Sequence, residues 1–94
     1  MTCSWTPVRL GRTDLTVCPL GIAAAYGISG RDVERAHERG VNLIYWGSSR
    51  SKDFGEAVKR IGARDRASMS LVLQTYARSA SGVGKSLEKA LRTL

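Results

Sequence analysis

The segment Gly84-Lys85-Ser86 contains the residue types of a phosphate-binding loop. In such a loop a glycine-rich turn points backbone amides at phosphates, a lysine contacts the phosphates and a hydroxyl binds Mg²⁺. The complete pattern, G-x-x-x-x-G-K-[ST], requires a glycine at position 79, where this chain has Ser79. A loop of small residues that opens a helix explains the segment more simply. Phosphate or nucleotide binding therefore stays a third hypothesis.

The other polar residues form no recognisable catalytic or metal-binding pattern. The chain has one histidine, His37, and its two cysteines, Cys3 and Cys18, are not in a C-x-x-C motif. We expect no metal site, and we expect both cysteines to be reduced thiols, with Cys18 as a small core residue. The acidic residues of the predicted helices have basic neighbours, which is typical of solvated ion pairs. These residues are Asp32, Glu34, Glu38, Asp53, Glu56 and Glu88.

Length and charge restrict the class of protein further. The 94 residues, 43% of them apolar, suffice for a single domain over 1–94, whereas a complete (β/α)8 barrel needs roughly 250 residues. Lys and Arg number 15 against 8 Asp and Glu, a net charge of +7, but the basic residues are scattered among acidic ones. We therefore expect no nucleic-acid partner. No apolar run approaches the ~20 residues of a membrane span and no secretory signal is readable, so we expect a cytoplasmic protein.

Hydrophobic periodicity divides the chain into alternating strands and helices. Ser29, followed by Asp32, predicts a capped helix start, and Gly40 and Gly62 predict two helix ends. Strands that alternate with helices of this length predict parallel strands joined by crossovers, and hence an α/β fold. The predicted elements are, in order, a hairpin over about 8–17, a strand over 17–23, a helix over 30–39, a strand over 41–46, a helix over 52–61, a strand over 69–76 and a helix from 82 to the end.

The predicted helices have apolar faces that identify candidate core residues. In the second helix, for which Ser51 is the predicted cap, Phe54, Val58 and Ile61 recur at helical spacing. Pro19 lacks a backbone donor, so it predicts a bulge, an edge or a strand start within the first strand. The last helix has an apolar stripe made of Val83, Leu87, Ala90, Leu91 and Leu94.

An ordered series of segments resembles the amino-terminal part of the aldo-keto reductases. The segment 9–17, Arg-Leu-Gly-Arg-Thr-Asp-Leu-Thr-Val, followed by Pro19-Leu20-Gly21, is similar to the hairpin that plugs the barrel floor in that family, with Asp14 where glycine is usual. Further similar segments are Val33-Glu34-Arg35-Ala36, Arg39-Gly40-Val41-Asn42, Phe54-Gly55-Glu56-Ala57, the strand 71–75 and the helix 86–94. The resemblance implies a partial (β/α)8 barrel with βα units over about 17–39, 41–61 and 69–94.

The same resemblance implies an NADPH-dependent oxidoreductase family whose catalytic positions are changed in this chain. The family transfers a hydride from NADPH to a carbonyl, with a Tyr acid supported by Lys, Asp and His. Tyr45 stands at the Asp position, Arg50 at the Tyr position and Tyr76 at the Lys position, and the His belongs to a fourth strand beyond Leu94. We expect no catalysis and no cofactor for this chain alone, with NADPH implied only if the carboxyl-terminal part of the barrel were present.

One reading of a different class and one enzymatic variant remain open beside this one. The chain is alternatively a non-enzymatic half-barrel that associates with itself or with a complementing barrel fragment, because three parallel strands leave two open edges. Its ligand surface would then lie at the carboxyl ends of the strands, lined by Tyr26, Trp46 and Tyr76. A remaining enzymatic variant, with Tyr45 or Tyr76 as proton donor, needs a nearby cation.

Overall fold

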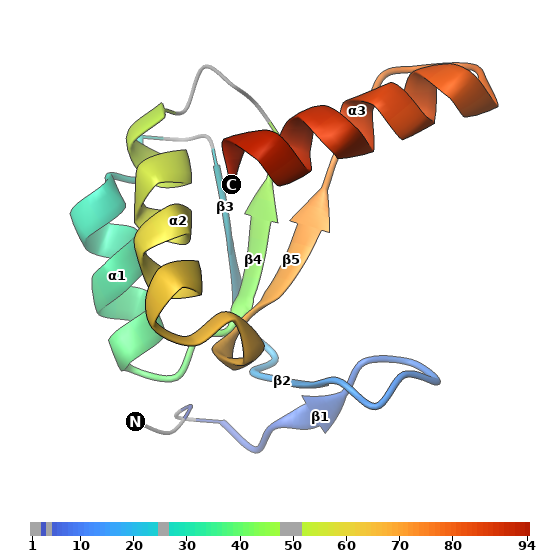
Figure 1. The fold of residues 1–94 in the computed structure, drawn as a ribbon. Helices are drawn as coiled ribbons and strands as arrows, with labels where there is room; N and C mark the ends of the chain where they lie inside the picture. The colour runs from blue at the N-terminus through green and yellow to red at the C-terminus, as the bar shows by residue number, and fades with distance from the viewer. Residues whose placement is uncertain (1–2, 4, 25–26, 48–51) are drawn as a thin grey trace.

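The computed structural model describes residues 3, 5–24, 27–47 and 52–94. It contains a two-stranded antiparallel hairpin and a separate three-stranded parallel sheet, with three α-helices (Figure 1). The elements are β1 (Val8–Arg9), β2 (Thr16–Val17), β3 (Gly21–Ala23), α1 (Gly30–Glu38), β4 (Leu43–Trp46), α2 (Lys52–Asp65), a 3₁₀ turn (Arg66–Ser68), β5 (Ser70–Leu73) and α3 (Ala80–Thr93).

The predicted α/β class, with parallel strands after a hairpin, is confirmed. The parallel sheet has the order β3-β4-β5, so the strands lie side by side in chain order. Ile22, Ile44 and Leu71 are in register across the three strands. The hairpin lies beneath the amino ends of these strands, and α3 lies across their carboxyl ends (Figure 1).

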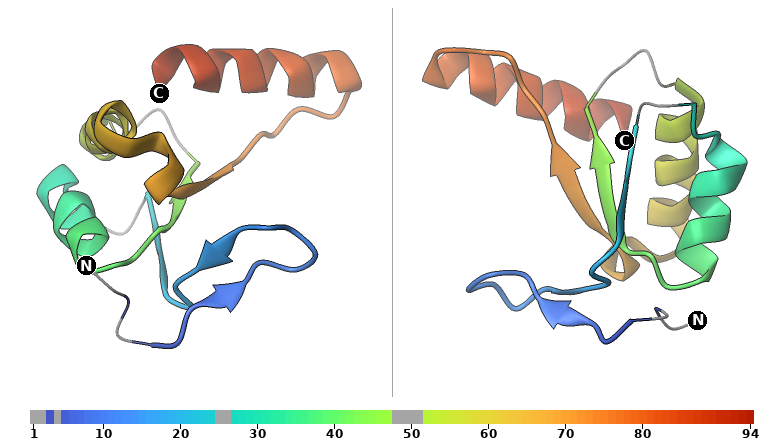
Figure 2. Two further views of the ribbon diagram at one scale, coloured as in Figure 1. Left: turned by 60° about the horizontal axis from the view of Figure 1, so that its bottom comes forward. Right: turned by 180° about the vertical axis from the view of Figure 1, so that it is seen from behind.

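The hydrophobic core lies between one face of the sheet and the helices α1 and α2 (Figures 1 and 2). Ile44 is fully buried from the sheet side, and Val33 of α1 faces it from the helical layer. The predicted core residues of α2, namely Phe54, Val58 and Ile61, are each about 1% exposed, which confirms the helical pattern. Burying side chains of this size contributes roughly 1.5–3 kcal/mol each.

Helix α1 begins and ends where local signals predict. The Ser29 side chain accepts a hydrogen bond from the Asp32 amide, and the Asp32 carboxylate accepts one from the Ser29 amide, which completes a capping box. Gly40 follows the helix with a φ of 93°, a left-handed conformation that favours glycine.

The prediction that α2 ends at Gly62 was wrong. The helix continues to Asp65, and Gly62 lies inside it. A Cβ at position 62 would lie 3.3 Å from the Met69 Cε atom, so the glycine makes room for a buried side chain rather than ending the helix. The helix ends instead at the 3₁₀ turn. The guanidinium of Arg66, the first residue of this turn, donates a hydrogen bond to the Met69 carbonyl oxygen. The predicted cap Ser51 lies outside the described residues.

The strands are shorter than the apolar runs that predict them. The run 17–23 divides into β2 and β3, with Pro19 between the two strands, because the chain turns from the hairpin into the sheet there. Strand β4 begins at Leu43 rather than at position 41, and β5 ends at Leu73 rather than at position 76.

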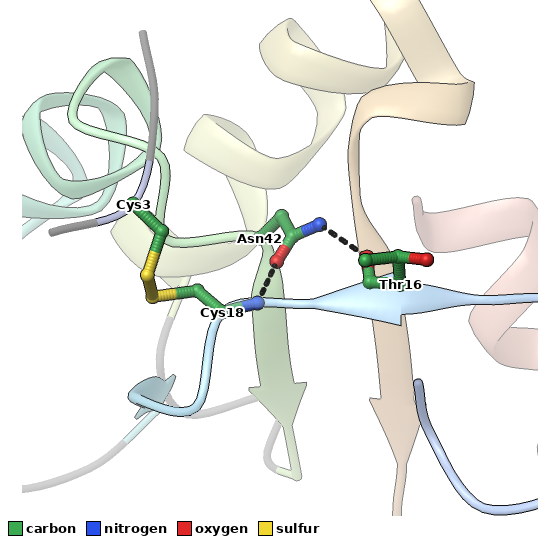
Figure 3. The surroundings of a disulfide bond; sticks show 4 residues. All are labelled: Cys3, Thr16, Cys18 and Asn42. Carbon is green, nitrogen blue, oxygen red and sulfur yellow. Dashed lines mark hydrogen bonds between the residues drawn. A yellow bond between two sulfur atoms is a disulfide. The ribbon is translucent and has the colours of Figure 1, made fainter. Parts of the chain in front are cut away.

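The hairpin is attached to the first part of the chain by a disulfide between Cys3 and Cys18 (Figure 3). The prediction that both cysteines are reduced thiols was therefore wrong, although Cys18 is buried as expected. The two Cα atoms lie 5.6 Å apart because the amino-terminal segment returns to the start of the sheet. The spacing of the two cysteines along the sequence does not indicate this return. No helix in the described part of the chain is long and apolar enough to cross a membrane.

Helix α3 does not lie flat against the sheet as α1 and α2 do. It starts at Ala80, two residues before the predicted position, where the Ser79 side chain accepts a hydrogen bond from the Gly82 amide. Of its predicted apolar stripe, Ala90 is buried and Leu94 packs against the core. The side chains of Leu87 and Leu91 are 50% and 69% exposed.

Candidate ligand surface at the carboxyl ends of the strands

A hollow of about 430 Å³ lies between α3 and the carboxyl ends of β4 and β5. Two of the three aromatic residues predicted to line a ligand surface, Trp46 and Tyr76, are in its wall. The third, Tyr26, lies outside the described residues. The remaining lining residues are Gly47, Leu73, Gln74, Thr75, Val83, Ser86, Leu87, Lys89 and Ala90.

Trp46 forms the inner wall of the hollow and is held by α2. It ends β4 on the same face as the buried Ile44, because alternate residues of a strand share a face. A Cβ at Gly55 would lie 3.1 Å from the Trp46 Nε1 atom, so the glycine lets the indole approach the helix. Within the described part of the chain this buried Nε1–H has no hydrogen-bond partner.

Tyr76 forms the outer rim of the hollow and is 82% exposed. The loop that holds it is joined to α3 by hydroxyl groups: Thr75 Oγ1 donates to Ser86 Oγ at 2.8 Å and accepts from the Ala77 amide at 3.1 Å. These two hydroxyls therefore fix the spacing between the loop and the helix. Sequence reasoning missed this pair, because it considered Ser86 only as the hydroxyl of a phosphate-binding loop and Thr75 only as the end of a strand.

The three positions that match catalytic residues of the aldo-keto reductases are not brought together in the described structure. Tyr45 lies on the sheet face opposite Ile44 and Trp46 and does not line the hollow, but its hydroxyl donates a hydrogen bond to Oε1 of Gln74, which does. Tyr76 lies at the rim of the hollow. Arg50 lies outside the described residues. Of the two described positions, Tyr76 lines the hollow and Tyr45 does not.

The segment Gly84-Lys85-Ser86 does not open a helix. It lies in the second turn of α3, which begins four residues earlier at Ala80. The backbone amides of this segment are therefore used by the helix's own hydrogen bonds and are not directed at a ligand. The loop geometry that phosphate binding requires is not formed by these residues.

Charged groups outside the hollow form ion pairs between α1 and α2. Glu34 accepts hydrogen bonds from Arg60 at 3.2 Å and from Arg64 at 3.3 Å. The hydrogen bond from Arg60, more than that from Arg64, holds the pKa of the Glu34 carboxyl below its ordinary value. This arrangement joins two helix surfaces and agrees with the prediction of solvated ion pairs for this acidic residue.

His37 contacts the 3₁₀ turn that follows α2. Its Nε2 atom lies 2.8 Å from Ser68 Oγ, and that hydroxyl donates to the Asp65 carbonyl oxygen. The ring is half-buried between α1 and the 3₁₀ turn. The described residues contain no group of three or more His, Cys, Asp or Glu side chains that could hold a metal ion.

Comparisons of the chain with protein-family models, with curated proteins and with solved structures find no match.

Proposed function

We propose that this chain is the amino-terminal part of an aldo-keto reductase-like (β/α)8 barrel that has lost the reductase chemistry. The observation that supports it best is the position of the hairpin. It lies under the amino ends of three sequential parallel strands, where the hairpin of that family plugs the barrel floor (Figure 1).

The side chain of Asn42, within a segment that resembles the family, supports the same proposal. Its Oδ1 atom accepts a hydrogen bond from the Cys18 amide, and its Nδ2 atom donates to the Thr16 carbonyl oxygen (Figure 3). The residue therefore joins the hairpin to the start of the second barrel-like unit. Asn42, in the segment that resembles the family, therefore has a structural role that needs no catalytic activity.

The uncovered face of the sheet is the face that would line a barrel. Ala23, Tyr45 and Val72 are in register there, and Val72 is 40% exposed. Seen from behind, no described helix covers this face (Figure 2). In a (β/α)8 barrel the inward-facing side chains of the other strands would cover these residues.

The loss of reductase chemistry is supported by what stands at the catalytic positions. The Tyr45 hydroxyl is engaged with an amide oxygen, and Tyr76 is largely exposed at a different place. NADPH does not fit the hollow as a cofactor, because its three phosphate groups need several cations or amide donors, and the lining includes one cationic side chain, Lys89. Among the described residues, these observations support a chain that lacks the acid and the cofactor site of the family.

A titration of NADPH into the full chain, followed by nicotinamide fluorescence, tests the absence of a cofactor site. We expect no saturable change in emission. Saturable binding that the Lys89→Ala variant removes would contradict the proposal, and a Lys85→Ala variant is the matched control because Lys85 does not line the hollow.

A further inference from the structure

Helix α3 has an exposed apolar face, at whose edge Leu87 also lines the hollow beside the strand ends. Ala80, Gly84, Leu87 and Leu91 lie on this face, since spacings of four, three and four residues return to one side of a helix. All four residues are exposed. A Cβ built at Gly84 would meet no atom within 4 Å, so the space above this glycine is open.

The order of large and small residues makes this face complementary to itself. In an antiparallel pair of such helices, a twofold axis between Lys85 and Ser86 places Leu91 opposite Ala80 and Leu87 opposite Gly84 of the other copy. Each leucine would then meet a small residue, which is the large-to-small interdigitation that allows two helices to approach closely. A twofold interface requires this kind of self-complementarity.

The chain as a whole exposes more surface than a compact monomer of its mass. A folded monomer of 10.2 kDa exposes about 5,300 Å² by the usual scaling with mass, whereas this chain exposes 6710 Å². The excess of about 1,400 Å² belongs to the whole chain, because exposed apolar side chains also lie on the hairpin and on the uncovered face of the sheet, and an interface of standard size would bury roughly 800 Å² on each partner. The position of α3, which stands away from the sheet, contributes to this excess (Figure 2).

We propose that two copies of this chain associate through an antiparallel pairing of their α3 helices, on the face formed by Ala80, Gly84, Leu87 and Leu91. The partner is a second copy because the face is apolar and matches itself under a twofold rotation. The inference rests on α3 alone and holds whether or not the chain derives from an aldo-keto reductase-like barrel. Since each copy carries a net charge of +7, added salt should strengthen the association by screening repulsion.

Sedimentation velocity over a range of protein concentrations tests the pairing. We expect the wild-type chain to reach twice its monomer mass. Gly84→Leu fills open space in the monomer and so leaves the fold intact, but it blocks Leu87 of the partner, so we expect the dissociation constant to rise by about tenfold or more. Lys85→Ala, on the far side of α3, is the matched control and should leave the dissociation constant within about threefold.

Three outcomes would overturn the proposal. One is a wild-type chain that remains monomeric at every concentration. Another is a dimer that Gly84→Leu does not weaken while circular dichroism shows the variant folded. The third is a dimer that Lys85→Ala weakens as much as Gly84→Leu does. If Gly84→Leu fails to fold, Leu91→Lys takes its place, because Leu91 is 69% exposed and its substitution leaves the core intact.

Discussion

The Cys18 amide donates a hydrogen bond to Asn42 Oδ1 at 2.8 Å, across a separation of 24 residues (Figure 3). The same side chain donates from Nδ2 to the Thr16 carbonyl oxygen at 3.0 Å. Two backbone groups of the hairpin therefore depend on one amide of the second βα unit, and Cys18 is also tied to the amino-terminal segment by its disulfide.

Replacing Asn42 with alanine should lower the free energy of unfolding by about 1–3 kcal/mol, because the buried Cys18 amide loses its acceptor. Asn42→Asp keeps that acceptor and loses the donor to Thr16, so we expect a smaller loss. Urea denaturation of the oxidised chains measures both. Equal effects of the two substitutions would show that the bond to the Cys18 amide is not the important one.

Reduction of the disulfide between Cys3 and Cys18 should destabilise the chain by about 3 kcal/mol, since the bond closes a loop of roughly 15 residues in the unfolded state. Thermal unfolding with and without a reductant measures the change. A Cys3→Ser, Cys18→Ser variant is the control and should not respond to reductant. Two free thiols in the unreduced, denatured wild-type chain would contradict the bond itself.

Two glycines of the helices should respond to alanine in opposite directions. A Cβ at Gly30 would lie 2.7 Å from the Asp53 carbonyl oxygen. The Gly30 amide also donates to Asp53 Oδ2 at 2.5 Å, which holds the two helix starts together. We expect Gly30→Ala to cost about 1–3 kcal/mol of unfolding free energy through this crowding.

Gly84→Ala is the matched substitution in open space and should stabilise the monomer by up to about 1 kcal/mol, because alanine is the better helix former. Chemical denaturation in dilute solution, where the chain is monomeric, compares the two variants. A stabilising Gly30→Ala would contradict the close packing of α1 against the start of α2.

Acid should weaken the contact between α1 and α2. Because the pKa of Glu34 lies below its ordinary value of 4.5, its charged form stabilises the fold above that pH, and the contribution is lost as the pH falls toward the folded pKa. Arg60 and Arg64 are 48% and 56% exposed, so solvent screens both ion pairs with the partly buried Glu34, and we expect less than about 1 kcal/mol.

Urea midpoints between neutral pH and pH 3 (roughly the range in which carboxyl groups titrate) measure this loss, and Glu34→Gln should give a flatter acid limb. Asp32 keeps part of the slope in that variant, because its hydrogen bond from the Ser29 amide also lowers its pKa. Glu88→Gln is the control, since Glu88 has no ion pair within the described residues. Identical acid limbs for Glu34→Gln and the wild-type chain would exclude this contribution.

The sequence predicted the features of the fold that depend on neighbouring residues. The capping box of Ser29 and Asp32 and the end of the first helix at Gly40 need contacts within a few residues, and both are confirmed. The apolar spacing of Phe54, Val58 and Ile61 likewise reports a helix face, and the three are buried together.

Features that depend on distant residues could not be read in the same way. The pairing of Cys3 with Cys18 depends on the return of the amino-terminal segment to the sheet. Gly62 looked like a helix end, but its neighbour Met69 lies beyond the helix. The stripe of α3 was visible, whereas the exposure of Leu87 and Leu91 depends on where the helix lies relative to the sheet. Of the predicted ligand surface, Trp46 and Tyr76 do share one hollow, and Tyr26 lies outside the described residues. Tyr45, which stands at a catalytic position of the family, lies on the other face of the sheet.

The central claim, an aldo-keto reductase-like unit without reductase chemistry, is tested most directly by the turnover of NADPH with benzaldehyde, followed by the loss of nicotinamide absorbance. We expect the full chain to match buffer alone, and a Tyr45→Phe, Tyr76→Phe variant to match the wild-type chain. Turnover by the wild-type chain that this double variant abolishes would contradict the account.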